Sequence, residues 1–313
     1  MPNSIIVHAV PVNKDVCGGI KVHYQMSMIE KELGYSSFIV YKEDEVPSIK
    51  WFEHSCNEYS LQHFKSYLEK EEKEVFLLIG WEDPSSLYIL PAKNKVAYIQ
   101  GHVFFRENAA YSNAKLWYNS EFVMRTCKYK GEVVRPYLAS YFFNTDRDAW
   151  SYNKDKYILL VQERKDGRKE WEKVARQLSK EVLEKLDVII WPNSNEKEFR
   201  DALARADIFF THSFPEGFGL PPLEAMALGA LVVGYTGGGG EDFMRDRENC
   251  FIAKDGVNCE VAEHITNIVL HNYLFLPSVI ANAHETSSFY SKEATLNILR
   301  KILKEYENGS ETV

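Results

Sequence analysis

The sequence predicts an α/β protein built from two parallel-sheet domains. The chain has 313 residues, about twice the usual length of one domain. Apolar residues make up 45% of the chain and charged residues 26%, a composition typical of globular proteins. Short apolar runs rich in β-branched and aromatic residues alternate with longer charged segments of helical spacing. This alternation is the pattern of repeated βα units, in which helices link parallel strands.

The expected strands are short and are spread over both halves of the chain. Many are apolar at consecutive positions, as strands are when helices cover both faces of a parallel sheet. In the first half they are 5–10, 37–41, 75–79, 96–100, 116–119 and 132–134, and in the second half 157–162, 188–191, 208–211, 231–235 and 250–253.

A polar stretch at 144–155 lies near the midpoint and lacks periodicity, so we interpret it as the linker between the domains. The predicted domains are therefore 1–145 and 146–290. The last segment, 291–313, is expected to be an amphipathic helix followed by a polar tail.

Charge, cysteines and hydropathy exclude several classes of protein. Lysine and arginine number 37 against 45 aspartates and glutamates, a net charge of -8, so no general field attracts nucleic acid. The five cysteines are widely spaced and form no Cys-x-x-Cys pair, which argues against a disulfide framework or a structural zinc site. No apolar stretch approaches the roughly 18 residues of a membrane span, and no basic leader precedes the first apolar run. We expect a cytoplasmic protein.

The most informative segment is 208–229, an apolar run followed by a loop rich in glycine and proline and then a short helix from about Pro222 to Gly229. In a parallel sheet such a loop lies at the carboxyl edge, where ligands of open α/β sheets bind. Backbone amides near the start of the helix can coordinate phosphate oxygens. The amides that we assign to this role belong to Gly217, Phe218, Gly219 and Leu220.

Two carboxylates, Glu216 and Glu224, are expected to flank this loop. An ionised carboxylate accepts hydrogen bonds from two adjacent hydroxyls, so these residues suit recognition of a sugar or a ribose. The alternative is that Glu216 caps the loop and that Glu224 is a helix-terminal charge favoured by the macrodipole.

Taken together, Glu216-Gly217-Phe218-Gly219-Leu220 and Glu224 resemble the hallmark of glycosyltransferase family 4, two glutamates with seven residues between them around an E-G-F-G-L core. The segments 204–208 and 224–233 are also similar to that family. The resemblance implies a GT-B fold, with two Rossmann-like domains facing an interdomain cleft and a C-terminal helix that crosses back. It implies a donor on the second domain and an acceptor on the first.

The resemblance also implies residue roles. Glu216 would contact hydroxyls of the donor sugar as a catalytic residue, and Glu224 the ribose. Arg164 and Lys169 have the family's spacing for two cations on the diphosphate, where charge develops as the nucleotide leaves. The family's glycines beside these cations are replaced here by glutamates, so Lys165 or Arg168 could supply the second charge. The alternative is a solvated basic turn.

Four further features of the sequence concern the site and its ligands. Gly18 and Gly19 are similar to the family's N-terminal glycine loop, which implies a role in donor binding. His102 follows an expected strand where the family has a histidine facing the donor sugar, which implies a second catalytic residue. The four glycines of 236–242 predict a loop that approaches a ligand or partner closely. The Asp-x-Asp spacing at 146–148 lies in the expected linker, so we interpret it as solvated charge and predict no metal site.

The predicted function is transfer of a sugar from a nucleoside-diphosphate sugar, with retention of configuration, without a metal and without any cofactor beyond the donor substrate. The acceptor is a glycan, a lipid or a small molecule, and peripheral contact with a membrane stays open. The alternatives are a sugar-nucleotide epimerase or phosphorylase on the same fold, or a non-catalytic subunit that binds nucleotide sugars. The sequence does not choose the base, the sugar, the acceptor or the oligomeric state.

Overall fold

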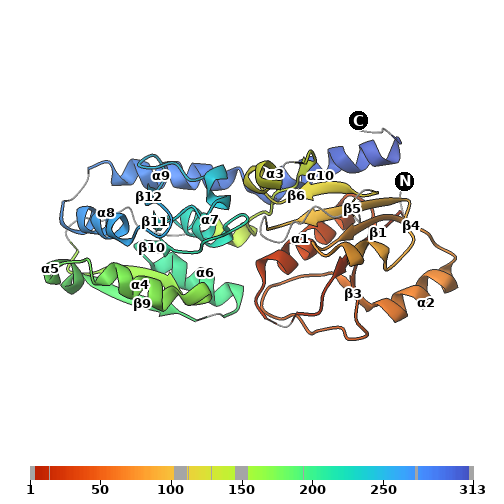
Figure 1. Cartoon of the computed structure of the whole chain (residues 1–313), viewed down its shortest axis with the longest axis horizontal. Helices are drawn as coiled ribbons and strands as arrows, with labels where there is room; N and C mark the ends of the chain where they lie inside the picture. The colour runs from red at the N-terminus through yellow and green to blue at the C-terminus, as the bar shows by residue number, and fades with distance from the viewer. Residues whose placement is uncertain are drawn as a thin grey trace. The chain divides into compact units, whose positions relative to one another are not determined.

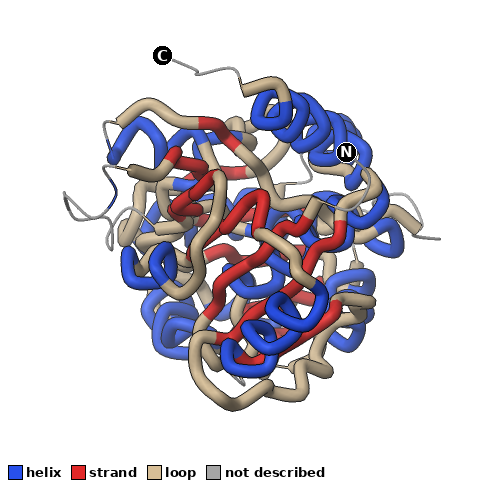
Figure 2. The backbone as a smooth tube through the Cα atoms, turned by 90° about the vertical axis from the view of Figure 1, so that its right-hand side faces the viewer, coloured by secondary structure: helices blue, strands red, loops and turns tan. Residues whose placement is uncertain are grey.

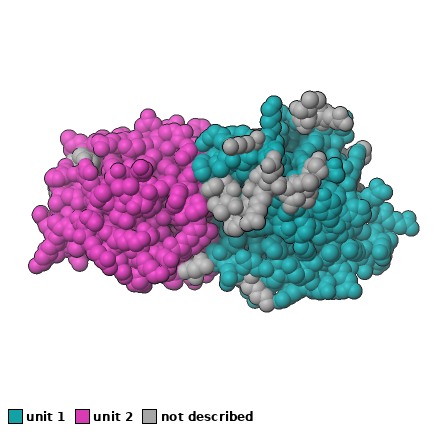
Figure 3. Space-filling view, viewed as in Figure 1, with its two compact units in different colours: residues 1–137, 292–313 teal, residues 138–291 magenta. Residues whose placement is uncertain are grey.

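The computed structural model describes residues 4–13, 15–101, 111, 113–127, 129–144, 154–192, 194–271 and 274–309. The chain divides into two compact units, 1–137 with 292–313 (unit 1) and 138–291 (unit 2), which Figure 3 colours separately. The division at 137/138 lies eight residues before the predicted boundary at 145/146. The last helix groups with unit 1 because its apolar side chains join the core of that unit.

Unit 1 contains a seven-stranded parallel sheet in the order β3-β2-β1-β4-β5-β6-β7. In this order β1 lies inside the sheet, as its completely buried residues require. The strands are β1 (Ile5–Val10), β2 (Ser36–Tyr41), β3 (Asn57–Ser60), β4 (Val75–Gly80), β5 (Asn94–Ile99), β6 (Lys115–Tyr118) and β7 (Glu132–Val133).

Helices cover both faces of this sheet (Figures 1 and 2). On one face, α1 (Gly18–Glu32) and α10 (Lys292–Glu307) share a core with β4, β5 and β6. On the other face, α2 (Leu61–Glu71) contributes Phe64, which packs on Phe38. The Trp117 indole donates to the Tyr306 hydroxyl at 3.0 Å and so ties α10 to β6. The remaining elements are α3 (Glu121–Cys127) and the 3-10 turns η1 (Pro84–Tyr88) and, in unit 2, η3 (Ser140–Phe142).

Unit 2 contains a five-stranded parallel sheet in the order β12-β11-β10-β8-β9. Its strands are β8 (Tyr157–Gln162), β9 (Leu186–Trp191), β10 (Ile208–Thr211), β11 (Leu231–Gly234) and β12 (Phe251–Ile252). Its helices are α4 (Gly167–Ala175), α5 (Lys180–Glu184), α6 (Glu196–Arg205), α7 (Leu220–Ala227), α8 (Asn258–Leu270) and α9 (Leu276–Ser288), with the 3-10 turns η4 (Arg164–Asp166) and η5 (Gly239–Asp242).

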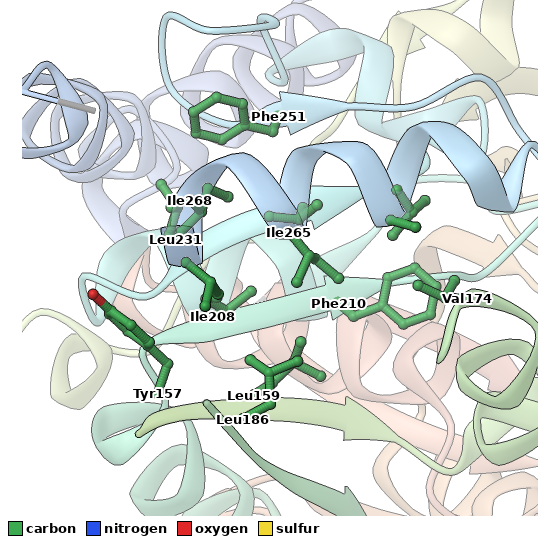
Figure 4. Packing of buried hydrophobic residues seen from close by; sticks show 14 of the residues in the cluster. Tyr157, Leu159, Val174, Leu186, Ile208, Phe210, Leu231, Phe251, Ile265 and Ile268 are labelled. Carbon is green, nitrogen blue, oxygen red and sulfur yellow. The ribbon is translucent and has the colours of Figure 1, made fainter. Parts of the chain in front are cut away.

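The core of unit 2 lies on both faces of its sheet. Figure 4 shows one face, where Ile265 and Ile268 of α8 pack over the strands. The opposite face packs on α6, α7 and α9, and α7 is buried over most of its length. Strands that are buried on both faces therefore support the loops at their carboxyl ends.

The predicted fold class, two parallel-sheet α/β units, is confirmed. Each predicted strand ends within two residues of an observed one. The prediction lacked β3. The sequence Asn57-Glu58-Tyr59-Ser60 is polar, and an edge strand that is only partly buried does not need the run of apolar residues by which the other strands were predicted. Gly18 and Gly19, which were expected to form a loop, lie in the first turn of α1.

The predictions about membrane spans and cysteines can be compared with the structure for the described residues. No helix there combines the length and the apolar character needed to cross a bilayer. All five cysteines are free thiols.

Candidate functional site

The loop between β10 and α7 carries the Glu216 motif. Gly219 is the N-cap of α7 with φ +95°, a left-handed conformation that favours glycine. Two prolines follow in the first turn, where their missing N–H groups leave no intrahelical bond unmade. The Phe218 ring lies in the core against Phe243 and Tyr290, so this side chain anchors the loop while its backbone follows the surface.

The glycine run after β11 packs directly on this loop. Glu216 N donates to Gly237 O at 2.8 Å, and Gly239 N donates to Glu216 O at 2.9 Å. A Cβ at Gly239 would lie 2.4 Å from Gly217 C and from Phe218 N. The close approach predicted for this run therefore involves a neighbouring loop of the same unit, which it fixes through two backbone hydrogen bonds.

The basic turn between β8 and α4 brings one lysine to Glu216. Lys165 Nζ lies 3.0 Å from Glu216 Oε2 and donates to Pro215 O at 2.7 Å. The Lys165 side chain is 35% exposed and that of Glu216 20% exposed. This pair is thus partly withdrawn from water, and its attraction is less screened than that of a surface pair.

The other two candidate cations point to partners of their own. Lys169 Nζ lies 2.9 Å from Asp166 Oδ1, and the hydrogen bond with Asp166 raises the pKa of Lys169. Arg168 Nε lies 3.6 Å from Glu163 Oε2. Both cations are more than half exposed. Of the three residues considered for the second cation, Lys165 is the one with an ion pair to Glu216.

The backbone of the basic turn is held by His212, a residue to which the sequence assigned no role. The His212 Nε2–H donates to Arg164 O at 2.8 Å, which fixes the tautomer because a carbonyl only accepts. His212 is 6% exposed, and its Nδ1 has no hydrogen-bond partner among the described residues. The signal for it in the sequence is a polar side chain immediately after the apolar strand that precedes the Glu216 loop.

These elements surround one pocket at the carboxyl ends of β8, β10 and β11. Its polar lining comes from Gln162, Thr211, His212, Ser213, Glu216 and Thr236. Hydroxyl, amide, imidazole and carboxylate groups can together donate to and accept from a polyhydroxylated ligand. Glu224 lies on α7 and is 5% exposed, and it is not among the residues that line this pocket.

Of the two glycines proposed for unit 1, Gly19 packs closely against protein atoms. A Cβ at Gly19 would lie 2.7 Å from the Trp81 ring and 3.1 Å from Gln100 Oε1, so this glycine lets α1 approach the ends of β4 and β5. Gln100 Nε2 donates to Gly19 O at 3.1 Å. His102 and the Asp-x-Asp spacing at 146–148 lie outside the described residues.

Unit 1 also buries a polar cluster that sequence reasoning missed. His8 Nδ1 lies 3.1 Å from His23 Nδ1, and His8 Nε2 lies 2.9 Å from Glu30 Oε2. The Ser37 hydroxyl donates to the same carboxylate oxygen at 2.6 Å. Burial, with His8 beside it, holds the pKa of His23 well below its usual range. These residues gave no signal because they meet only when α1 packs on β1, which places His8 beside residues 15 and 22 positions further along the chain.

A second titratable group lies at the carboxyl end of β4. Glu82 Oε1 accepts from Gln100 N at 2.8 Å, and desolvation raises the pKa of Glu82 to about 7.

Comparisons with known proteins agree with this geometry. Residues 153–286, which include the basic turn, Glu216 and Glu224, match the family model described as glycosyl transferases group 1. No curated protein matches the sequence.

Among solved structures, sucrose-phosphate synthase from Thermosynechococcus elongatus matches with a TM-score of 0.74 and 13% identity, covering 98% of this chain and 100% of that one. Anabaena HepE in complex with UDP matches with a TM-score of 0.71 and 12% identity, covering 96% and 100%. A glycosyltransferase from Rickettsia africae matches with a TM-score of 0.70 and 14% identity, covering 100% of both chains. The chain thus has the GT-B fold, and its residues 153–286 match the glycosyl transferases group 1 family, which confirms the resemblance that the motif from Glu216 to Glu224 predicted.

Proposed function

We propose that the protein transfers a sugar from a nucleoside-diphosphate sugar to a glycan, lipid or small-molecule acceptor, with retention of configuration. The observation that carries the proposal is the pairing of the Glu216 carboxylate with the Lys165 ammonium beside the pocket in unit 2. A carboxylate suits sugar hydroxyls and an ammonium suits phosphate. The family match to 153–286 supports it, as do the HepE structures, which are described as complexes with UDP, with UDP and glucose, and with UDP-glucose.

In this proposal Glu216 accepts hydrogen bonds from hydroxyls of the donor sugar, and Glu224 binds the ribose. Arg164, a second cation of the basic turn and the amides of the Glu216 loop bind the diphosphate. Charge develops on the diphosphate as the bond to the sugar breaks, and preorganised cations and amides stabilise it without reorganising. The proposed reaction assigns this neutralisation to protein groups in place of a metal ion.

Retention is assigned to attack from the face that the nucleotide leaves. The bond between the anomeric carbon and the diphosphate oxygen breaks, and the acceptor oxygen bonds to the anomeric carbon on the same face. The proton of the acceptor hydroxyl passes to the departing diphosphate. The cations of the basic turn favour this order because they stabilise the leaving group before the new bond is complete.

The test is a product analysis with several nucleoside-diphosphate sugars and a panel of acceptors. We expect release of nucleoside diphosphate together with an α-linked product from an α-linked donor. Glu216→Ala should lower kcat by about 10²- to 10³-fold. Glu263→Ala, which changes an exposed carboxylate on α8, is the matched control and should leave kcat unchanged.

Other outcomes separate the alternatives. Conversion of the donor sugar without release of nucleotide indicates an epimerase, and a requirement for inorganic phosphate indicates a phosphorylase. Nucleotide binding without turnover of any donor indicates a non-catalytic subunit. Full activity of purified Glu216→Ala would contradict the role given to Glu216.

A further inference from the structure

The Lys165 ammonium is engaged by two acceptors from the Glu216 loop. Nζ donates to Pro215 O at 2.7 Å and lies 3.0 Å from Glu216 Oε2. An ammonium has three donors, so one remains for a further acceptor. The side chain is 35% exposed, which leaves that donor a route to a ligand. Lys165 is thus anchored to the Glu216 carboxylate without being enclosed.

The backbone aims Lys165 at this position. Lys165 and Asp166 both adopt left-handed conformations, with φ 55° and 61°. Such conformations are costly for residues other than glycine and persist where the surroundings hold them. The holding contacts are the His212 hydrogen bond to Arg164 O and the packing of Gly167, where a Cβ would lie 1.9 Å from Gln162 O. With the backbone held, the lysine side chain is the part that can reorient, through rotation about its side-chain bonds.

Each member of the ion pair has a second natural partner in the proposed donor. Hydroxyls of the sugar donate to carboxylates, and oxygens of a diphosphate accept from ammonium groups. A sugar that takes both oxygens of Glu216 must compete with Lys165, and a diphosphate that takes Lys165 releases Glu216. The two halves of the donor would therefore bind cooperatively.

We propose that Lys165 is the second diphosphate-binding cation of this site and that its transfer from Glu216 to the diphosphate frees Glu216 for the donor sugar. The inference rests on the proposed function, which supplies the donor. It assigns to Lys165 the role that the family spacing gave to Lys169.

The test is calorimetric titration with UDP, GDP and ADP, followed by a double-mutant cycle with the nucleotide that binds. Lys165→Met should weaken binding of the nucleoside diphosphate about 10- to 100-fold, the usual range for a hydrogen bond to a charged group. Lys165→Asn is a second variant that tolerates the left-handed backbone and should weaken binding similarly. Lys173→Met, which removes an exposed lysine paired with Glu170 on α4, is the matched control and should bind like wild type.

Glu216→Gln measures the coupling. In the wild-type background it should tighten nucleotide binding because it releases Lys165. In the Lys165→Met background it should tighten binding less, since only the repulsion between carboxylate and phosphate is then removed. The difference between the two backgrounds isolates the interaction. We expect a coupling of about two- to fivefold, as for a partly exposed ion pair.

The remaining outcomes are decisive. Equal effects of Glu216→Gln in both backgrounds would overturn the exchange, and loss of binding in Lys169→Met but not in Lys165→Met would overturn the assignment of the cation. If none of the three nucleotides binds the wild-type protein, the proposed function itself fails for these donors. Amide hydrogen exchange in β8 and β10, unchanged from wild type, establishes that each variant keeps the fold of unit 2.

Discussion

The two units differ in how far the polar side chains beside their sheets are exposed to solvent. In unit 2 the polar side chains line a pocket at the ends of the strands, and the Lys165–Glu216 ion pair is partly exposed to solvent. In unit 1, His8, His23 and Glu30 lie between a strand and a helix with no exposed surface. A ligand or water can therefore replace a partner in the ion pair of unit 2, whereas the polar cluster of unit 1 is closed to both.

This difference in exposure indicates different roles for the polar cluster of unit 1 and the ion pair of unit 2. A buried charged or polar group must be satisfied by protein partners, and removal of one partner strands the others in a medium of low dielectric. A partly exposed pair costs little to open, because water or a ligand can replace either partner. We therefore expect the cluster of unit 1 to matter for stability and the pair of unit 2 to matter for binding.

The largest effect on stability is expected for Glu30→Ala. This change leaves His8 Nε2 and the Ser37 hydroxyl without their shared acceptor inside the protein. It should destabilise unit 1 by about 3–5 kcal/mol, as removal of one member of a buried pair does. Amide hydrogen exchange in β1 and β2, compared with β8 and β10, measures the loss for each unit.

Glu32→Ala is the matched control for Glu30→Ala. Glu32 lies two residues further along α1 and pairs with Lys292 at the surface, where both side chains are more than 40% exposed. Its removal should cost less than about 1 kcal/mol. If both changes lowered the free energy of unfolding equally, the buried cluster and the surface ion pair would not differ in their contribution to stability.

A smaller effect is expected where two loops of unit 2 touch. Gly239→Ala places a Cβ 2.4 Å from backbone atoms of Gly217 and Phe218, so the Glu216 loop must shift. We expect a loss of about 3 kcal/mol, the upper part of the range for overpacking, together with weaker binding of nucleoside diphosphates. Chemical denaturation, together with amide hydrogen exchange in β10 and β11, measures the loss of stability.

The neighbouring glycine provides the control. A Cβ at Gly240 would meet Met244 Sδ at 2.8 Å, and a methionine side chain can move aside. Gly240→Ala should therefore cost less than about 1 kcal/mol. Wild-type nucleotide affinity in Gly239→Ala would contradict the view that this contact positions the site.

The last effect is expected on the pH dependence of the stability of unit 1. The pKa of Glu82 is raised from 4.5 to about 7 by desolvation, so between these values the folded state holds a proton that the unfolded state releases. This group therefore makes stability fall as pH rises through that window. Glu82→Gln removes the contribution, so the variant should gain stability relative to wild type from pH 4.5 to 7.

The gain should not exceed about 1.4 kcal/mol per pH unit, the limit for one proton. His23 contributes with the opposite sign, because its lowered pKa makes stability fall as pH drops below its usual value. That contribution cancels in the difference between variant and wild type. A pH-independent difference in the free energy of unfolding would show that Glu82 does not titrate in this window.

The sequence by itself determined the fold class, eleven of the twelve strands found among the described residues, and the Glu216 motif. These features are local, since apolar runs, glycine and proline positions and the spacing of two glutamates all lie within short stretches of chain. Only the tertiary structure decided that α10 belongs to unit 1, that Asn57–Ser60 is an edge strand and that His8, His23 and Glu30 meet. It also singled out Lys165 among three neighbouring cations, because a left-handed turn sets which side chain reaches Glu216, some fifty residues further along the chain. Such contacts depend on how distant segments pack, and no local pattern of residues records them.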